Sequence, residues 1–513
     1  MSQPKTILPR VSRWLILILI LMTSCRQAAP GATPGAGSKA LPNNTQSTSV
    51  AATPKPGAPT HTPTPVRPPI TPTPPPTRTP PETTAIYYTV RPGDTLSSIA
   101  VAYGTTVEEL MHLNNIRNAD QLVAGKELQV ALAAQHIGPE QVLIPDSDLV
   151  YGPGYRDFDV AKVTAEFPGI FHNYKEDVAG QTMTGPEIVQ RIANEYSVGP
   201  RALLSLLELR GGWLTDADPP AEQRAYPLGY SDYPNLKDSL YLQLSMAADA
   251  LNVGFYGWQL DTLWLVQTGD GGYIQYATAI NAATAGVQRA LAIGTSGYDD
   301  WLADLRHFPI VYRSLFGDPF RYTVEPLVPE DTTNTTLELP WAQGQTWHYT
   351  GGPHPGWGSQ GAWSAIDFAT SERNLGCAIS TRWVTAAAPG KIIASENGMV
   401  LQDLDGDGFA GTGWVLLYLH MDKEGRVAAG TTVKTGDRIG HPSCEGGVSN
   451  ATHLHFARRY NGVWIPADSE QWPLILSGWQ AHSDGTAYNG TMTKDGVTRT
   501  AWESWENINA IRR

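Results

Sequence analysis

A proline-rich segment near the start of the chain limits what the rest can fold into. Sixteen of the 40 prolines lie between Pro30 and Pro81, and Thr, Ala and Gly occupy most of the positions around them. Few of these side chains could be buried, and proline-rich chains adopt an extended conformation of about 3.1 Å per residue. We therefore expect residues 26–85 to be a disordered tether with a reach on the order of 150 Å. Folded domains are expected only after it.

Length and charge narrow the class of protein further. The chain has 513 residues, and at roughly 150 residues per domain it is expected to form three or four units. It has 36 Lys and Arg against 49 Asp and Glu, a net charge of −13. Binding to nucleic-acid phosphates needs clustered Lys and Arg, which this chain lacks, so a nucleic-acid partner is excluded.

The first 25 residues have the pattern of an export signal. Lys5, Arg10 and Arg13 precede the apolar run WLILILILM, which is too short for a comfortable membrane span and suits a signal peptide. The following MTSC resembles the cleavage box of bacterial lipoproteins, which implies that Cys25 is lipidated and becomes the new N-terminus. We expect an exported protein, lipid-anchored at the outer face of the bacterial membrane. The alternative is a cleaved, fully secreted protein without Cys25.

The cysteine count favours one disulfide. The chain has three cysteines, and removing Cys25 leaves Cys377 and Cys444. An even pair in an exported chain predicts a disulfide between them. Two free buried thiols are the alternative.

Residues 86–131 show the order strand, helix, helix, strand. The turn RPGD is followed by helical spacing from Leu96 to Tyr103, and a second helix around Leu110 precedes the strand ELQV. Through TVRPGDTLSSIAVAYG, LNNI and LVAGKEL, this segment resembles the LysM module, a small α+β fold. The resemblance implies binding to N-acetylglucosamine-containing glycan of peptidoglycan. The residues implicated are Gly93, Asp94, Thr95, Leu96, Asn114, Asn115 and Ile116.

Residues 135–330 have a helical pattern and predict an all-α domain. Ile188, Ile192 and Tyr196 share one helical face, the next helix begins at Pro200, and further helical runs lie at 238–252 and 274–293. The stretch LLSLLELRGGW resembles the helix of lysozyme-type lytic transglycosylases that ends in a catalytic Glu.

That alignment places Arg210 where the general acid belongs, with Glu208 two residues earlier. Because Arg cannot release a proton, we interpret the domain as a degenerate, lysozyme-like binding or spacer unit.

From about residue 335 the pattern becomes that of antiparallel strands. In GWVLLYLHM, Leu416, Tyr418 and His420 are expected on one face. In ATHLHFARR, His453 and His455 point to the same face, where one imidazole could bind a metal and the other could contact the metal-bound water. A catalytic zinc site usually has three protein ligands, so others must come from elsewhere in the chain.

Asp367 is the upstream candidate, because an unpaired carboxylate in the apolar stretch AIDFA would be costly to bury. Through Asp367, YLHM and HLHF the chain resembles the lysostaphin-type, or LytM-like, zinc endopeptidases. Most of that family has a ligand histidine four residues before the aspartate, where this chain has Trp363. The staphylolysin branch takes its histidine from a TGGPH-like stretch thirteen residues ahead of the aspartate, which corresponds to His354.

The resemblance therefore implies a zinc ion bound by His354, Asp367 and His455. It assigns His420 and His453 to the zinc-bound water and the transition state, and which of the two is the general base stays open. His348 is the rival first ligand, and His441 is interpreted as a contact at the rim.

Two further features are interpreted with alternatives. In DLDGDGFAGTGW, Asp403, Asp405 and Asp407 imitate the start of a calcium loop, but Trp414 stands where a bidentate Glu belongs. A glycine-rich hairpin turn explains this stretch equally well. The role of residues 471–513, expected to be a C-terminal β extension, is not readable from the sequence.

The domains together predict a function. We expect a signal peptide (1–25), a tether (26–85), a LysM module (86–131), a helical domain (135–330), a zinc endopeptidase (335–470) and the extension (471–513). Such a protein would hydrolyse peptide cross-links of peptidoglycan, with LysM raising the local concentration of the substrate. The alternative is a catalytically inactive LysM/LytM-like lipoprotein that binds peptidoglycan and activates amidases.

Overall fold

The computed structural model describes residues 86–91, 94–103, 105–119, 122–131, 134, 136–372 and 376–513. The predicted signal peptide with Cys25, the tether and the glycan-binding candidate Gly93 lie outside these residues. None of the helices in the described ranges combines the length and the hydropathy that crossing a membrane requires.

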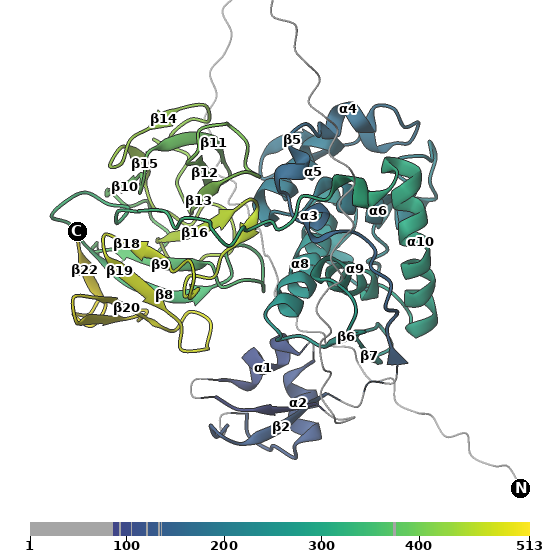
Figure 1. Cartoon of the computed structure of the whole chain (residues 1–513), viewed down its shortest axis with the longest axis horizontal. Helices are drawn as coiled ribbons and strands as arrows, with labels where there is room; N and C mark the ends of the chain where they lie inside the picture. The colour runs from purple at the N-terminus through teal and green to yellow at the C-terminus, as the bar shows by residue number, and fades with distance from the viewer. Residues whose placement is uncertain are drawn as a thin grey trace, which may run out of the picture. The chain divides into compact units, whose positions relative to one another are not determined.

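The LysM-like segment folds in the predicted order (Figure 1). β1 (Ile86–Thr89) pairs antiparallel with β2 (Glu127–Ala131), and α1 (Leu96–Ala102) and α2 (Val107–Leu113) come between them in sequence. The strand and helix spacings bring apolar residues into one small core: Val90, Leu96, Ile99, Ala100, Leu110, Leu128 and Val130.

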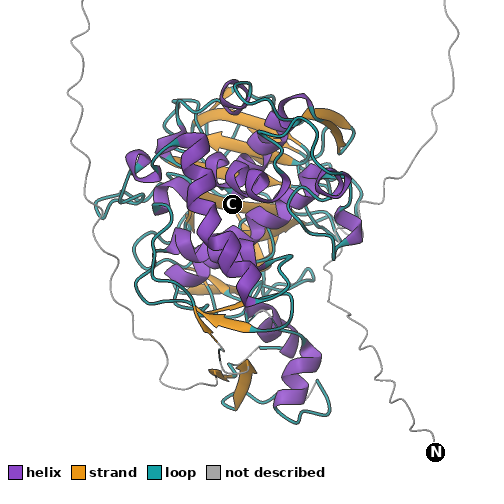
Figure 2. Cartoon of the chain, turned by 90° about the vertical axis from the view of Figure 1, so that its right-hand side faces the viewer, coloured by secondary structure: helices purple, strands orange, loops and turns teal. Residues whose placement is uncertain are grey.

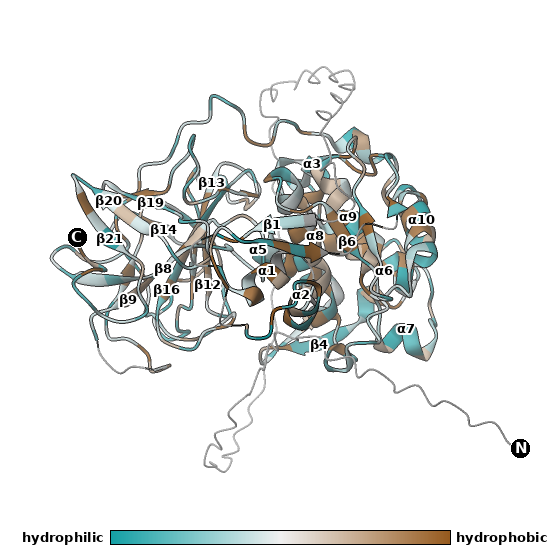
Figure 3. Ribbon diagram, turned by 90° about the horizontal axis from the view of Figure 1, so that it is seen from below, coloured by the Kyte–Doolittle hydropathy of each residue, from teal (hydrophilic) through white to brown (hydrophobic). Residues whose placement is uncertain are grey.

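The middle part, from residue 136 to about 330, consists of helices with short strands and loops between them (Figure 2). Its longest helices are α8 (Leu240–Gln259) and α10 (Tyr298–Phe316), and α8 packs against α9 (Ala282–Ala292). Figure 3 shows α8 and α9 largely in the brown of hydrophobic residues, as expected for helices buried on most sides. The other helices are α3 (Asp146–Leu149), α4 (Val160–Thr164), α5 (Gly185–Tyr196), α6 (Pro200–Gly211), α7 (Ala221–Ala225) and the 3₁₀ helices η1 (Pro153–Tyr155), η2 (Phe171–Asn173), η3 (Pro234–Leu236) and η4 (Pro319–Tyr322).

The middle part is not all-α as predicted. β4 (Lys175–Val178) and β5 (Gln181–Thr184) form a hairpin, while β6 (Leu265–Gln267) pairs with β7 (Tyr273–Gln275), which also pairs with β3 (His136–Ile137). The helix expected from residue 274 therefore starts only at Ala282. Strands of two to four residues are too short for hydrophobic periodicity to distinguish them from helix.

The C-terminal part is mostly β, as predicted. Within the described residues, nine strands form an antiparallel sheet in the order β14-β11-β12-β13-β16-β9-β8-β22, with β17 paired to β16. Its strands are β8 (Thr346–His354), β9 (Ala365–Thr370), β11 (Gly390–Glu396), β12 (Met399–Asp403), β13 (Trp414–Leu419), β14 (Thr432–Val433), β16 (Leu454–Tyr460), β17 (Val463–Trp464) and β22 (Ala510–Arg512). β10 (Val384–Thr385) and β15 (Arg438–Gly440) pair separately.

The segment after residue 470 belongs to the same fold. β18 (Ile475–Leu476), β19 (Trp479–His482), β20 (Thr491–Lys494) and β21 (Val497–Thr500) form a second antiparallel sheet. β22 then returns to the large sheet and pairs with β8. The extension thus supplies the edge strand next to the strand that ends in His354.

The two faces of the large sheet have different partners. Leu416 and Phe456 belong to a core formed within the C-terminal part. Leu417 and Ala457, one position along the same strands, belong to a core that also contains most apolar residues of α5, α6, α8 and α9. The middle part therefore covers one face of the sheet.

Polar contacts strengthen this interface. The backbone N–H of Trp464 donates to the hydroxyl of Tyr256 at 3.0 Å, and its indole Nε1 donates to the carbonyl of Tyr196 at 3.2 Å. Arg459 donates to the carbonyl of Asn194 at 2.9 Å. Because each group is buried, these bonds fix how the two parts meet.

The shared core predicts cooperative unfolding. Trp464→Ala should lower the free energy of unfolding by about 3–5 kcal/mol, because a buried Trp leaves a cavity. The middle and C-terminal parts should still unfold in a single transition, measured by calorimetry and by chemical denaturation. Trp502→Ala, at a side chain that is 56% exposed, is the matched control and should change stability by less than about 0.5 kcal/mol. Two separate transitions in the wild type would contradict a shared core.

Candidate metal centre

Three neighbouring strands bring one carboxylate and two imidazoles together. In the sheet order β16-β9-β8, His455 lies directly opposite Asp367, and His354 is the last residue of β8 on the other side of β9. Opposite residues of an antiparallel pair have Cβ atoms about 4.5–5.5 Å apart. The register thus places His455 beside Asp367, whereas on β8 Gly351 lies opposite Asp367 and an irregularity in the strand leads to His354, which pairs with Ala365.

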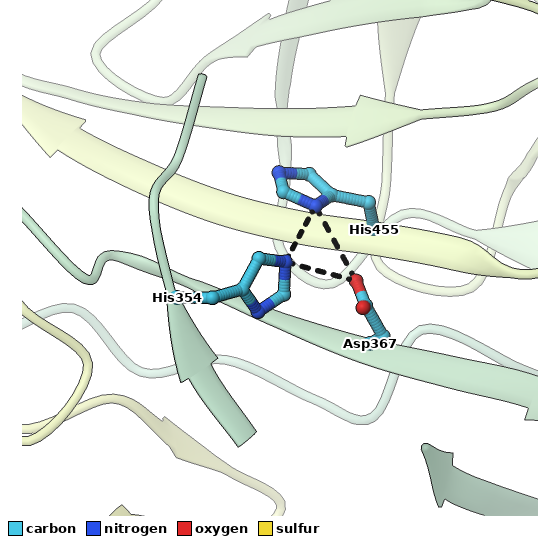
Figure 4. A group of neighbouring side chains, drawn as sticks. All are labelled: His354, Asp367 and His455. Carbon is cyan, nitrogen blue, oxygen red and sulfur yellow. Dashed lines mark hydrogen bonds and ion pairs between the residues drawn. The ribbon is translucent and has the colours of Figure 1, made fainter. Parts of the chain in front are cut away.

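The three side chains converge on one point (Figure 4). Oδ1 of Asp367 lies 3.3 Å from Nε2 of His354 and 3.3 Å from Nδ1 of His455, and these two nitrogens are 3.0 Å apart. The exposed fractions of His354, Asp367 and His455 are only 2%, 7% and 7%. Despite its burial, Oδ1 of Asp367 accepts no hydrogen bond.

Backbone carbonyls determine which nitrogen of each imidazole carries the proton. Nδ1 of His354 lies 2.7 Å from the carbonyl oxygen of Gly352, and Nε2 of His455 lies 3.0 Å from that of Gly356. A carbonyl oxygen can only accept, so these nitrogens are the donors and the opposite nitrogen of each neutral ring keeps a free lone pair. Both lone pairs face the carboxylate of Asp367.

This arrangement fits a zinc ion. Two lone pairs and a carboxylate oxygen without a donor would repel one another in a buried site unless a cation lay between them. In tetrahedral zinc sites with bonds of about 2.0–2.1 Å, neighbouring ligand atoms are about 3.3 Å apart, and the distances here are 3.0 and 3.3 Å. Three protein ligands leave one position for water, as in catalytic rather than structural zinc sites.

The protonation states agree with metal binding. Burial raises the pKa of Asp367, but the positive charges that the rings of His354 and His453 carry when protonated lower it well below its usual range, and a bound cation in their place would act in the same direction. Burial also lowers the pKa of His455. The carboxylate is therefore ionised and the imidazole neutral, which are the forms that bind a metal.

The glycines of the TGGPH stretch make room for the carboxylate. β8 is irregular between Tyr349 and His354, and a Cβ on Gly351 would lie 2.4 Å from Oδ2 of Asp367. A larger residue there would displace the carboxylate. The next glycine, Gly352, supplies the carbonyl that orients His354.

Two more histidines lie beside the three. Nε2 of His453 is 3.7 Å from Oδ1 of Asp367, and the ring of His420 is 4.5 Å from that of His453. Nδ1 of each lies near a backbone carbonyl, at 2.8 Å from Ala451 for His453 and at 3.2 Å from Glu445 for His420. By the same reasoning, both Nε2 atoms keep a lone pair.

His420 does not share a face with Leu416 and Tyr418, as the strand pattern predicted. β13 ends at Leu419, and His420 has a φ of 68°, in the left-handed region, which turns its side chain toward His453. Tyr418 stays in the opposite core and donates to Gln402. Burial, followed by the charges of His453 and His455, lowers the pKa of His420 to about 3.

The predicted disulfide joins Cys377 to Cys444, with Cα atoms 5.3 Å apart. Cys444 precedes Glu445, whose carbonyl orients His420. Thr452, the residue before His453, donates to the carbonyls of Gly376 and Ala378 beside Cys377. The disulfide thus ties together two loops that hold His420 and His453.

Tyr488 is a site residue that sequence reasoning missed. Its ring stacks on that of His354, with centroids 4.1 Å apart and planes at 20°. Its backbone N–H donates to the carbonyl of Pro353, and its carbonyl accepts from Gly352. The loop after β19 therefore braces the ligand strand, a contact for which the sequence carries no local signal.

His348, the rival first ligand, and His441, expected at the rim, have other partners. Nδ1 of His348 lies 3.0 Å from Oδ1 of Asn509. His441 packs on the ring of Trp383 and bonds to the carbonyl of Arg382. Neither belongs to a metal-binding group within the described residues.

A calcium ion at Asp403, Asp405 and Asp407 is not supported. All three carboxylates accept backbone N–H groups of their own loop, and Asp407 also pairs with Arg156. The loop joins β12 to β13, which pair with each other. It is the glycine-rich hairpin turn that was the alternative interpretation.

The structure separates the LysM candidates into two groups. Leu96 is 1% exposed in the LysM core, and the amide of Asn114 bonds to the backbone of Leu110 and Gln129, so both have structural roles. Thr95 forms reciprocal bonds with Ser98 at the start of α1. The other described candidates are Asp94, which accepts from Tyr88 and the N–H of Arg91, the exposed Asn115 and the half-buried Ile116.

Glu208 and Arg210, the two residues compared with the catalytic acid of glycosidases, both have partners in the middle part. Glu208 accepts from the backbone N–H groups of Leu214 and Thr215 and so caps a turn. Arg210 forms an ion pair with Asp304 and donates to three backbone carbonyls. These are structural roles, and they provide no proton donor for glycan cleavage.

Three family models match the chain. The LysM domain matches residues 88–131, the LasA N-terminal domain matches residues 142–329, and peptidase family M23 matches residues 363–466. The middle part, compared above with lysozyme-type enzymes, is thus similar to a domain of LasA. His354 lies upstream of the residues that the M23 model matches.

Individual proteins are similar to parts of this chain. Protease LasA of Pseudomonas aeruginosa (strain UCBPP-PA14) is 27% identical over 301 residues, which cover 54% of this chain and 67% of LasA. N-acetylmuramoyl-L-alanine amidase XlyA of Bacillus subtilis (strain 168) is 35% identical over 82 residues, 15% of this chain and 28% of the amidase. Among solved structures, the deep-sea M23 metalloprotease pseudoalterin is 25% identical and covers 35% of this chain and 100% of its own, with a TM-score of 0.29.

The ligand set makes a direct prediction about metal content. The purified protein should contain one zinc ion per chain by elemental analysis. His354→Ala and His455→Ala should each lose the zinc ion, because the two ligands that remain in either variant are not enough to hold it. The control variants His348→Ala and His441→Ala should keep it. If His348→Ala lost the zinc while His354→Ala kept it, the assignment of ligands would be wrong.

The disulfide predicts a separable effect on activity. Replacing both Cys377 and Cys444 by Ser should cost about 2–5 kcal/mol of stability. It should also lower kcat, because the loops that hold His420 and His453 lose their link, while zinc stays bound. Reductant should produce the same change in the wild type and none in the double variant. Loss of zinc together with activity would show that the disulfide supports the ligands instead.

Proposed function

We propose that this chain, which combines a LysM domain with a peptidase family M23 domain and is homologous to the protease LasA, is a zinc-dependent endopeptidase of bacterial peptidoglycan. It would hydrolyse peptide cross-links of the cell wall. The observation that carries the proposal is the convergence of His354, Asp367 and His455 on one buried point, with His453 and His420 beside it.

The residues have distinct roles in this proposal. His354, Asp367 and His455 would hold the zinc ion, which supplies a water molecule of lowered pKa and polarises the peptide carbonyl. A net positive centre of one metal and one carboxylate would favour the negative charge that develops on that oxygen.

Burial assigns the two remaining histidines. The side chain of His453 is 18% exposed, and its Nε2, which keeps a lone pair, lies 3.7 Å from Oδ1 of Asp367, so it is placed to accept a proton from a water at the centre. His420 is 3% exposed, and its low pKa disfavours a charged ring. We therefore assign proton transfer from the water to the leaving amine to His453, while His420, with its lone pair on Nε2, would accept a hydrogen bond from the water.

The N-terminal regions would bring the enzyme to its substrate. LysM binding to glycan would raise the local concentration of peptide cross-links around the peptidase. The similarity of part of the chain to two N-acetylmuramoyl-L-alanine amidases supports a site of action in the bacterial cell wall. Lipidation of Cys25 would anchor the protein at the outer face of the membrane, and residues 26–85 would carry the domains away from it.

The proposal is tested by muropeptide release from purified peptidoglycan. His453→Ala and His420→Ala should each lower kcat by about 10²–10⁴-fold and keep one zinc ion, because neither residue is a ligand. His441→Ala is the control and should cleave at the wild-type rate.

The alternative, an inactive activator of amidases, makes the opposite prediction. A wild-type protein that binds zinc and peptidoglycan, releases no peptide fragments and stimulates an added amidase would overturn the endopeptidase proposal.

A further inference from the structure

The loop between β8 and β9, residues 355–364, controls one of the metal ligands. The carbonyl of Gly356 in this loop accepts the hydrogen bond from Nε2 of His455 at 3.0 Å. That bond places the proton of His455 on the outer nitrogen and the lone pair on the inner one. The loop must therefore hold its position for His455 to bind zinc.

The loop is glycine-rich, with glycines at 356, 358 and 361. Gly358 and Gly361 have φ values of 80° and 145°. A backbone of this kind has many accessible conformations, so contacts from outside the loop are needed to select one.

The middle part supplies such a contact through Asp249 of α8. One oxygen of its carboxylate accepts the backbone N–H of Ser359 at 2.8 Å, and the other accepts the hydroxyl of Ser359. A Cβ on Gly358 would lie 2.3 Å from the same carboxylate, so only glycine fits beside it. Trp357 packs against Tyr196 of α5, with ring centroids 6.2 Å apart.

We infer that Asp249 is a positioning residue of the peptidase: it holds the β8–β9 loop so that the Gly356 carbonyl keeps His455 in the tautomer that binds zinc. This inference rests on the proposed function of the site. It assigns a role to the middle part that is neither glycan cleavage nor simple spacing. The chemistry of the metal centre then depends on a helix that contributes no ligand.

The test compares variants in the full-length protein. Asp249→Ala removes both acceptors and should weaken zinc affinity by about tenfold, measured by chelator competition. Mutation of residues that support metal ligands typically lowers metal affinity by about 10–100-fold. NMR of the metal-free protein should show that His455 no longer has a single tautomer. Asp249→Asn keeps an acceptor for the N–H of Ser359 and should restore most of the affinity.

Two further variants separate positioning from stability. Ser197→Ala removes another hydrogen bond across the same interface, from the hydroxyl of Ser197 to the carbonyl of Gly462, and should leave zinc affinity and the His455 tautomer unchanged. Ser359→Ala, on the exposed loop, keeps the backbone contact and should weaken zinc binding less than Asp249→Ala. If Asp249→Ala fails to fold, the zinc affinity of Ser359→Ala compared with that of the wild type still tests the contact.

The outcomes decide the inference independently of the enzyme assay. Unchanged zinc affinity and an unchanged His455 tautomer in folded Asp249→Ala would overturn it. If the wild type binds zinc but cleaves nothing, the proposed function fails, while the affinity series still decides the role of Asp249.

Discussion

The carboxylate of Asp367 is the constraint on which the rest of the C-terminal part depends. It is ionised and buried in the middle of a sheet, and one of its oxygens accepts no hydrogen bond. Such a charge is tolerated only where cations or well-aligned dipoles surround it. A cation held between this carboxylate and the lone pairs of His354 and His455 on the flanking strands would meet this need, and glycine at 351 leaves the space that the carboxylate occupies.

Backbone carbonyls orient the imidazoles. Each of the four histidines around Asp367 gives one N–H to such a carbonyl: His354 to Gly352, His420 to Glu445, His453 to Ala451 and His455 to Gly356. Gly352 belongs to β8, and the other three carbonyls belong to loops, which decide which nitrogen of those three rings faces the centre. This division explains why a disulfide and a helix of the middle part can both affect the same few atoms.

Much of the candidate site is predictable because strands have a simple period. The alternation in HLHF places the two histidines on the opposite face from Leu454 and Phe456, and the cost of burying Asp367 singles it out. The features that the sequence did not predict depend on contacts between residues far apart in the chain or on backbone conformation. The left-handed φ of His420 breaks the alternation at the end of β13, and the contacts of Tyr488 and Asp249 with the ligand segments join residues more than a hundred positions apart. The short strands of the middle part fell below the length at which periodicity is informative.

The core that the middle part shares with the large sheet has a practical consequence. Leu417, Leu419 and Ala457 lie on the metal-bearing face and are covered by the middle part. A peptidase excised from its neighbour would present these side chains to water as a contiguous apolar patch, the kind of surface that drives self-association. Transplanting this catalytic unit into another protein would therefore require carrying the helices along or redesigning that face with polar residues.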